Sequence, residues 1–174
     1  ALLAQKTGFS LFKTSTQLRE LAEANAHLKD KILSAMQKGD LVPYWLVMYL
    51  WLKDALISPD MKGVIIDGAV RHEEEARLFH EVAKWFDRPY KVLFLEVSDE
   101  EMQKRISKRA EIEARTDDND ESLAKRMQEY ADHTKLAVDF FKNAGTYIEV
   151  NGEGSIEDIH ARVLEVVQKE FEIK

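Results

Sequence analysis

Three short apolar runs, separated by long amphipathic stretches, place the strongest limit on the fold. The runs cover Val64 to Ile66, Lys91 to Val97 and Thr146 to Val150; the first leads into Asp67-Gly68 and the last into Asn151-Gly152. Continuous apolar runs bounded by Gly, Pro or Asp are typical of parallel strands covered on both faces. Phe9 to Lys13 is a fourth, weaker candidate strand.

Helical patterns fill the intervals between these runs. Ser98 is expected to be the N-cap of one helix, with Glu101 completing a capping box. The expected helices cover Ser15 to Gln37, a run that starts at Pro43, His72 to Phe86, Ser98 to Arg109, Leu123 to near Gly145, and Ile156 to Phe171. Alternating strands and helices predict a three-layer α/β fold with a parallel sheet and right-handed crossovers, in one domain of residues 1–174.

The long helix that ends near Gly145 is expected to carry one continuous face. Its apolar and small polar residues recur every three or four positions, which is the spacing of one side of an α-helix. The members of this face are Leu123, Met127, Tyr130, Thr134, Val138 and Phe141.

Charge and cysteine content exclude several kinds of protein. The net charge of −7 argues against nucleic-acid binding through general basic charge, so we expect no nucleic-acid partner. The absence of cysteine from the sequence excludes disulfides and thiolate zinc sites within it. The histidines show no metal-ligand spacing, and no apolar stretch approaches the length of a membrane span. A reducing cytoplasmic setting is therefore expected, without a membrane partner.

Four arginines lie close together in this acidic chain. Arg105 and Arg109 are four residues apart and so share one helix face, Arg115 lies in a polar stretch, and Arg126 falls in the first turns of the next helix. Guanidinium groups bind phosphate oxygens two at a time and remain charged. The cluster therefore indicates a site for a polyanion. The alternative is that these arginines, with nearby lysines and carboxylates, form solvated helix faces.

A second arginine follows the first apolar run. Asp67 is expected at the carboxyl end of a strand, where parallel sheets bind ligands, and its carboxylate could hold a hydrated Mg²⁺ ion that bridges phosphates. Gly68 would allow close approach of a ligand, and Arg71 could take a phosphate. The alternative is an Asp-Gly turn followed by a solvated arginine.

In order along the chain, four motifs resemble the nucleoside monophosphate kinases, most closely the adenylate kinase family. Lys38-Gly39-Asp40-Leu41-Val42-Pro43 resembles the family's Gly-(Glu/Asp)-Leu-Val-Pro, and Asp67-Gly68-Ala69-Val70-Arg71 resembles its Asp-Gly-Phe-Pro-Arg. Arg115-Thr116-Asp117-Asp118-Asn119, followed by Arg126 and Tyr130, resembles its Arg-x-Asp-Asp-Asn segment. Asn151-Gly152-Glu153-Gly154-Ser155 resembles its last strand and the turn beside the nucleotide base. The resemblance covers nearly the whole chain.

The resemblance implies a P-loop-kinase-like fold and transfer of the terminal phosphoryl group of ATP to a nucleoside monophosphate, with AMP as the expected acceptor and Mg²⁺ as cofactor. It implies a helical insertion at about 14–43 that binds the monophosphate, a short lid at about 110–120 and a monomeric enzyme. On the acceptor side it implies that Arg19 and Arg71 hold the phosphate, that Thr14 lies near the base and that Glu75 occupies the position of the glutamine that reads adenine.

The resemblance also implies the donor side of the site. Arg105 and Gly154 would lie near the donor nucleotide, and Asp67 would hold Mg²⁺ through water. Arg109, Arg115 and Arg126 would surround the transferring phosphoryl group together with Arg71. Judged from the residues themselves, Asp117 and Asp118 in this stretch could hold these guanidinium groups when the ligand is absent, or pair with them on closure.

The sequence departs from the family in several places. The Phe-Pro of the Asp-Gly-Phe-Pro-Arg motif is replaced by Ala69-Val70, and the adenine-reading glutamine by Glu75. These changes favour an alternative, a non-catalytic nucleotide-binding or scaffold relative. A third alternative is an α/β domain with arginines that only decorate its surface.

The family's phosphate-binding loop, Gly-x-x-x-x-Gly-Lys, is not found in this sequence. Residues 1–9 resemble the helix after that loop. The family's first strand lies between those corresponding to Val64–Asp67 and Lys91–Val97, so we expect these two strands to be separated and to have unpaired edges. We therefore expect a fragment of an active kinase, or a sequence lacking its front, with little or no activity as it stands. The alternative is a degenerate relative with a rearranged sheet.

Overall fold

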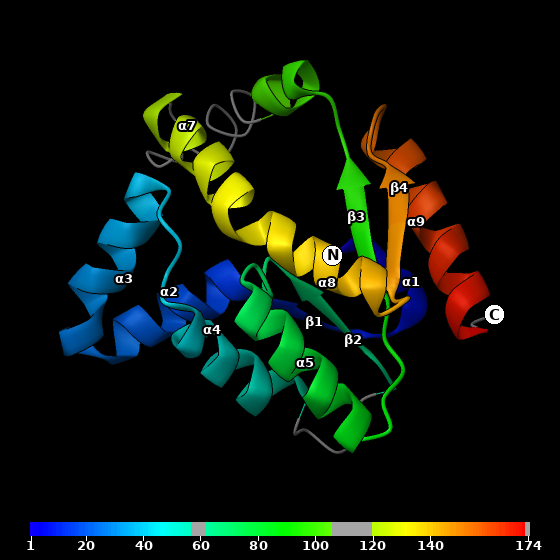
Figure 1. The fold of residues 1–174 in the computed structure, drawn as a ribbon, viewed down its shortest axis with the longest axis horizontal. Coiled ribbons are helices and arrows are strands. Elements are labelled where there is room, and N and C mark those ends of the chain that lie inside the picture. Colours follow the sequence, from blue (N-terminus) through cyan, green and yellow to red (C-terminus); the bar gives the residue numbers. More distant parts are fainter. Residues whose placement is uncertain (57–61, 106–119, 173–174) are drawn as a thin grey trace.

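The structure, a computed structural model, describes residues 1–56, 62–105 and 120–172 (Figure 1). Its strands are β1 (Ser10–Lys13), β2 (Val64–Asp67), β3 (Val92–Glu96) and β4 (Tyr147–Asn151). Its helices are α1 (Leu2–Thr7), α2 (Thr14–Ala24), α3 (Ala26–Lys38), α4 (Tyr44–Trp51), α5 (Glu73–Trp85), α7 (Asp120–Glu129), α8 (Lys135–Asn143) and α9 (Ile156–Phe171), with residues 99–105 also helical. Two π-helical segments, η1 (Leu52–Leu56) and η2 (Tyr130–Thr134), continue α4 and α7.

The four expected strands form, and both strand pairs are parallel. β1 pairs with β2 from Ser10↔Val64 to Lys13↔Asp67, and β3 pairs with β4 from Val92↔Tyr147 to Glu96↔Asn151. The described strands thus make two separate two-stranded sheets instead of one continuous sheet. The expectation that β2 and β3 are not paired with each other is confirmed.

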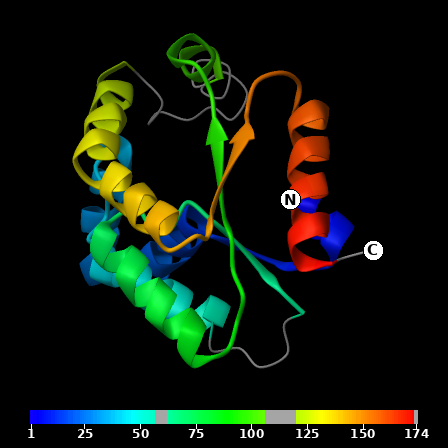
Figure 2. The ribbon, with the colours of Figure 1, turned by 45° about the vertical axis from the view of Figure 1, so that its right-hand side comes forward.

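Helices cover both faces of the β3–β4 pair. In Figure 2, α9 lies on one side of these strands and α8 on the other, and both helices contact β4. α1 packs against α9, and α5 packs against α8. The arrangement confirms the mixed α/β class expected from the alternating pattern. Among the described helices, none combines the length and apolar character needed to cross a membrane.

The buried residues fall into two clusters. The larger one fills the space between the β1–β2 pair and helices α2 to α5, around the fully buried Trp51 and its edge-on contact with Phe79. The smaller one joins α5 to α8 through Ala76, Ala137 and Phe141. Val70 and Tyr90 pack against both clusters and so connect them.

Local capping explains two departures from the expected helices. The expected helix from Ser15 to Gln37 is broken at Asn25, whose extended backbone ends α2 and whose side-chain oxygen accepts a hydrogen bond from the His27 amide at 3.1 Å. Ser98 does cap the helix at 99–105, because its Oγ accepts from the Glu101 amide at 3.3 Å. The reciprocal bond of the expected capping box comes from Glu153 instead of Glu101, since Glu153 Oε1 accepts from the Ser98 amide at 2.7 Å.

The long helix before Gly145 is interrupted by the π-helical turn η2. A π-turn adds a residue to one turn and so rotates the following side chains relative to the preceding ones. Among the described side chains of the expected face, Val138 and Phe141 of α8 are thus buried, whereas Met127 of α7 and Tyr130 are each 41% exposed.

Gly152 is the tightest packing point beside β4. A Cβ atom at this position would lie 2.7 Å from Val97 Cγ1 and 2.8 Å from the Glu96 backbone oxygen. Gly152→Ala is expected to lower the free energy of unfolding by about 1–3 kcal/mol, because the backbone cannot move aside without strain. Chemical denaturation measures the effect. Gly145→Asn is the control, because position 145 has open space around it and asparagine tolerates a positive φ; equal losses in both variants would contradict the packing argument.

Candidate functional site

The carboxyl end of β2 leads into a turn with unusual backbone geometry. Asp67 ends the strand with an exposed side chain, and Gly68 follows at φ +77°. Val70 has φ +59°, which is strained for a β-branched residue. Strain of this kind is kept only where the surroundings enforce it, and it is concentrated at functional sites.

This turn brings Gly68 and Arg71 against the start of α2. Lys13 of β1 is in register with Asp67, so the next residue, Thr14, faces the turn. A Cβ atom built on Gly68 would lie 3.7 Å from Arg71 Nη2 and 4.0 Å from Thr14 Oγ1. Three predicted site residues, Thr14, Asp67 and Arg71, are thus gathered around Gly68 at one strand end.

Thr14 is a buried polar residue without a partner in this arrangement. Its side chain is 6% exposed, and its Oγ1 has no hydrogen-bond partner among the described residues. Buried hydroxyl groups are nearly always paired, so an orphan one calls for an explanation. It lies in the first turn of α2, where backbone amides also point outward and favour an anion. Arg19, farther along α2, is half-buried and donates from Nη1 to the Ser15 carbonyl oxygen at 3.4 Å.

Glu75, predicted at a base-reading position, is 2% exposed, and its carboxylate is surrounded by donors. Oε2 accepts from the amides of Arg71 at 2.8 Å and His72 at 3.3 Å, and Oε1 accepts from the Trp51 indole Nε1 at 3.4 Å. Burial raises the pKa of this carboxyl group, an effect that the hydrogen bonds from Arg71, His72 and Trp51 only partly offset. The reading of a base by Glu75 stays a prediction.

The second part of the site lies at the carboxyl ends of β3 and β4. Arg105 donates from Nη2 to the carbonyl oxygens of Gly152 at 2.7 Å and Gly154 at 3.4 Å, and its Nε pairs with Glu101 at 2.7 Å. The structure therefore brings together Arg105 and Gly154, the two described residues that were predicted at the donor side.

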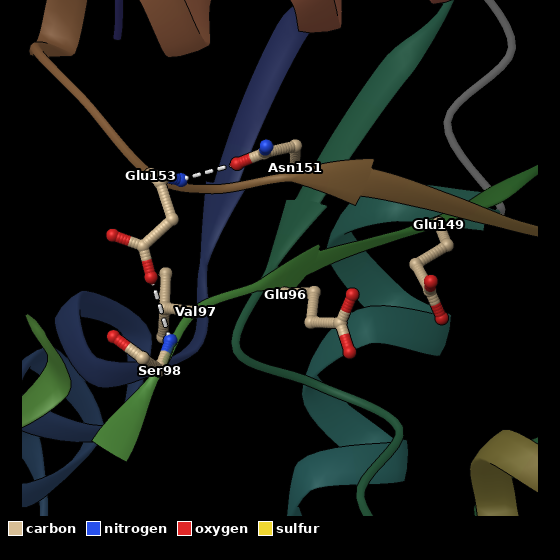
Figure 3. Close-up of a pocket in the computed structure, with 6 residues that line it drawn as sticks. All are labelled: Glu96, Val97, Ser98, Glu149, Asn151 and Glu153. Atoms are coloured by element: carbon tan, nitrogen blue, oxygen red, sulfur yellow. Dashed lines mark hydrogen bonds between the residues drawn. The ribbon is translucent and has the colours of Figure 1, made fainter. Parts of the chain in front are cut away.

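A pocket of about 340 Å³ lies beside this loop and is lined by Glu96, Val97, Ser98, Glu149, Asn151 and Glu153 (Figure 3). Its carboxylates disfavour a phosphate group inside it. Hydrogen bonds from Ser98 hold the pKa of the Glu153 carboxyl below its usual value. On the β4 side, burial and the neighbouring Glu149 raise the pKa of Tyr147 to about 12. The contact of Glu153 with Ser98 is not recognisable from the sequence, because the two residues are far apart in the chain.

Side chains from α7 and η2 reach the acceptor side of the molecule. Lys125 Nζ lies 3.4 Å from Asp40 Oδ1, and the His133 ring packs on the His72 ring with centroids 4.6 Å apart. The Tyr44 ring also packs on the His72 ring, with centroids 5.4 Å apart. Burial, followed by the electrostatic effect of the neighbouring His133, lowers the pKa of His72. The helix expected after the lid therefore contacts the turn that carries Arg71.

The remaining predicted residues are not placed by the structure. Arg109, Arg115, Asp117 and Asp118 lie outside the described residues, and only the backbone of Arg126 is described, within α7. In the described part of the chain, no group of three or more His, Cys, Asp or Glu side chains is arranged to hold a metal ion. Mg²⁺ needs no such group, because it keeps several waters and is held by one or two carboxylates together with substrate phosphates. The exposed Asp67 fits that requirement.

Comparison with known proteins identifies the relatives of this chain. The profile of the adenylate kinase family matches residues 1–146. Adenylate kinase isoenzyme 1 of Sus scrofa is 34% identical over 165 residues, covering 92% of this chain and 82% of the relative, and that of Oryctolagus cuniculus is 31% identical over 163 residues with the same coverage. The adenylate kinase of Thermus thermophilus is 33% identical over 165 residues, covering 92% of this chain and 84% of the relative.

The orphan hydroxyl of Thr14 gives a testable result. Thr14→Val keeps the shape of the side chain and removes the unpaired group, so it is expected to raise the free energy of unfolding of the ligand-free protein by about 1 kcal/mol. Thermal or chemical denaturation measures the change. Thr146→Val is the matched control, because the Thr146 hydroxyl donates to the Phe141 carbonyl oxygen and its removal should not stabilise the protein. A loss of stability in Thr14→Val would show that the hydroxyl has a partner in solution.

Proposed function

This chain belongs to the adenylate kinase family, and we propose that it acts on nucleotides by transferring the terminal phosphoryl group of ATP to a nucleoside monophosphate, with AMP as the acceptor. The observation that carries the proposal is the grouping of Thr14, Gly68 and Arg71 at the carboxyl end of β2. It combines a guanidinium, an unpaired hydroxyl and a helix N-terminus. Each of these groups suits a phosphorylated ligand.

On the acceptor side, Arg71 and Arg19 bind the phosphate of the monophosphate, and Thr14 lies beside the nucleotide. Gly68 lies directly beside the Arg71 guanidinium, since a Cβ atom at position 68 would be in van der Waals contact with it. Fixing the acceptor phosphate in this way turns the reaction into an effectively intramolecular one, which lowers the entropic part of the barrier.

On the donor side, Arg105 and the 152–154 turn lie next to the ATP base. Arg109, Arg115 and Arg126 surround the transferring phosphoryl group, and Asp117 and Asp118 pair with them when the lid closes. The sequence has no Gly-x-x-x-x-Gly-Lys run, so we expect the donor side to be the weaker half of the site in these 174 residues.

Mg²⁺ accompanies ATP in this proposal, and Asp67 would hold it through water. When bound, it offsets the negative charge of the phosphate oxygens. The chain's own part is positioning and charge neutralisation. The bond between the γ-phosphorus and the oxygen of the leaving ADP breaks as a bond forms to an oxygen of the acceptor phosphate, in line and without a covalent enzyme intermediate.

The second candidate function is non-catalytic nucleotide binding. It is favoured by the turn at Ala69-Val70, where the family motif has Phe-Pro. Proline fixes φ near −65°, whereas Val70 has φ +59°, so this turn differs from one that contains proline.

A coupled assay with ATP, Mg²⁺ and each monophosphate separates the two functions. ADP formation supports the kinase, and tight monophosphate binding without turnover supports the second candidate.

Arg71 provides the sharpest test of the acceptor site. Arg71→Ala is expected to weaken AMP binding about tenfold or more, because charge-assisted bonds to phosphate contribute about 1.5–3 kcal/mol. Isothermal titration calorimetry measures the affinity. Arg77→Ala removes the same charge from α5, where Arg77 pairs with Glu73 and lies over the Phe140 ring, and should leave AMP binding unchanged. Equal affinities of the Arg71→Ala variant and the wild type would count against the assignment.

A further inference from the structure

We propose that Glu75 and Trp51 together form a positioning device for Arg71, and that Glu75 does not read the base of the acceptor. This inference deepens the proposed function and rests on it, since Arg71 matters only if a phosphorylated acceptor binds there. It differs from the role that the resemblance implies for position 75.

The Glu75 carboxylate faces the interior of the protein. The side chain is 2% exposed, so almost none of its surface is available to a ligand from solvent. One oxygen accepts from two consecutive backbone amides, and the other accepts from the indole of Trp51, which is itself fully buried. The carboxylate is therefore used internally, by donors that come from the turn before α5 and from α4.

These hydrogen bonds hold the backbone that follows Val70. The two amides belong to Arg71 and His72, directly after the strained Val70. A left-handed valine costs free energy, so this backbone conformation persists only if neighbouring contacts stabilise it. The Val70 side chain packs against both hydrophobic clusters on one side, and Glu75 binds the next two amides on the other. Together they fix the backbone from which the Arg71 side chain extends.

The surroundings of position 75 require a side chain that accepts hydrogen bonds with both of its terminal atoms. The Trp51 indole and the amides of Arg71 and His72 are all N–H donors, and a carboxylate can accept from all of them. A glutamine has one oxygen and one NH₂ group, so it must direct donor hydrogens toward either the indole or the two amides. A glutamate at position 75 can therefore accept hydrogen bonds from the Trp51 indole and from both amides of the turn at the same time, whereas a glutamine cannot. A turn that contains proline at position 70 could not adopt this geometry.

Affinity measurements with several bases test the inference. Glu75→Leu, which removes both acceptor oxygens at similar volume, should weaken binding of AMP, GMP and CMP by the same factor, about tenfold, because the phosphate contact common to all three is disturbed. A change in the ratio of these affinities would show that Glu75 reads the base and would overturn the inference. Unchanged affinity for all three would overturn it as well.

A second pair of variants keeps the test informative if Glu75→Leu does not fold. Glu75→Gln should lower the unfolding midpoint and the affinity in the wild-type background. In the Trp51→Phe background the indole donor is gone, so the same glutamine substitution should cost clearly less in both measurements. Equal costs in the two backgrounds would contradict a joint role of the two residues.

Hydrogen exchange separates failure of this inference from failure of the proposed function. If the wild-type protein binds no monophosphate, the kinase proposal fails, and the positioning device is then judged without ligand. The amides of Arg71 and His72 and the Trp51 indole N–H should be protected in the wild type. They should exchange at least about tenfold faster in Glu75→Gln or Glu75→Leu, while the amide of Phe79 stays protected. Rapid exchange of these groups in the wild type would overturn the inference.

Discussion

The contact between α5 and α8 is the interaction on which the rest of the molecule depends. Within the described residues, the two strand pairs share no ladder, so side-chain packing must set their relative position. α5 follows β2 in the chain, and α8 precedes β4, so this helix contact connects both pairs, as the contact between α1 and α9 also does. Ala76 and Ala137, almost without exposed surface, allow the two helices to approach closely, and Phe141 fills the remaining space. Hydrophobic burial here replaces the backbone hydrogen bonds that a continuous sheet would supply.

Much of the fold could be predicted from the sequence, because periodic apolar spacing and capping residues act locally. The strand that ends at Asp67, the helix that follows Pro43 and the helix capped by Ser155 all form as expected. The failures occur where a nonlocal or single-residue effect decides. Asn25 breaks a pattern that periodicity alone shows as continuous, and η2 rotates one half of a helix against the other.

The part of the candidate site that could be predicted from the sequence is the set of residues that belong to recognisable motifs. Thr14 and Arg71 lie around Gly68, and Arg105 contacts Gly154, while the binding roles that the motifs imply for them stay predictions. The sequence could not reveal that the Glu75 carboxylate faces inward, because its partner Trp51 belongs to an apolar run with no visible polar role. The roles of Arg109, Arg115 and Arg126 remain predictions, since the structure leaves those side chains undescribed.

The π-turn η2 also has a consequence for how one helical rod serves two parts of the molecule. α7 lies against α3 and reaches Asp40 through Lys125, whereas α8 lies against α5 and β4. A π-turn changes the phase of the side chains that follow it. The direction in which α8 presents Ala137 and Phe141 to α5 is therefore set by η2 and not by the phase of α7 alone.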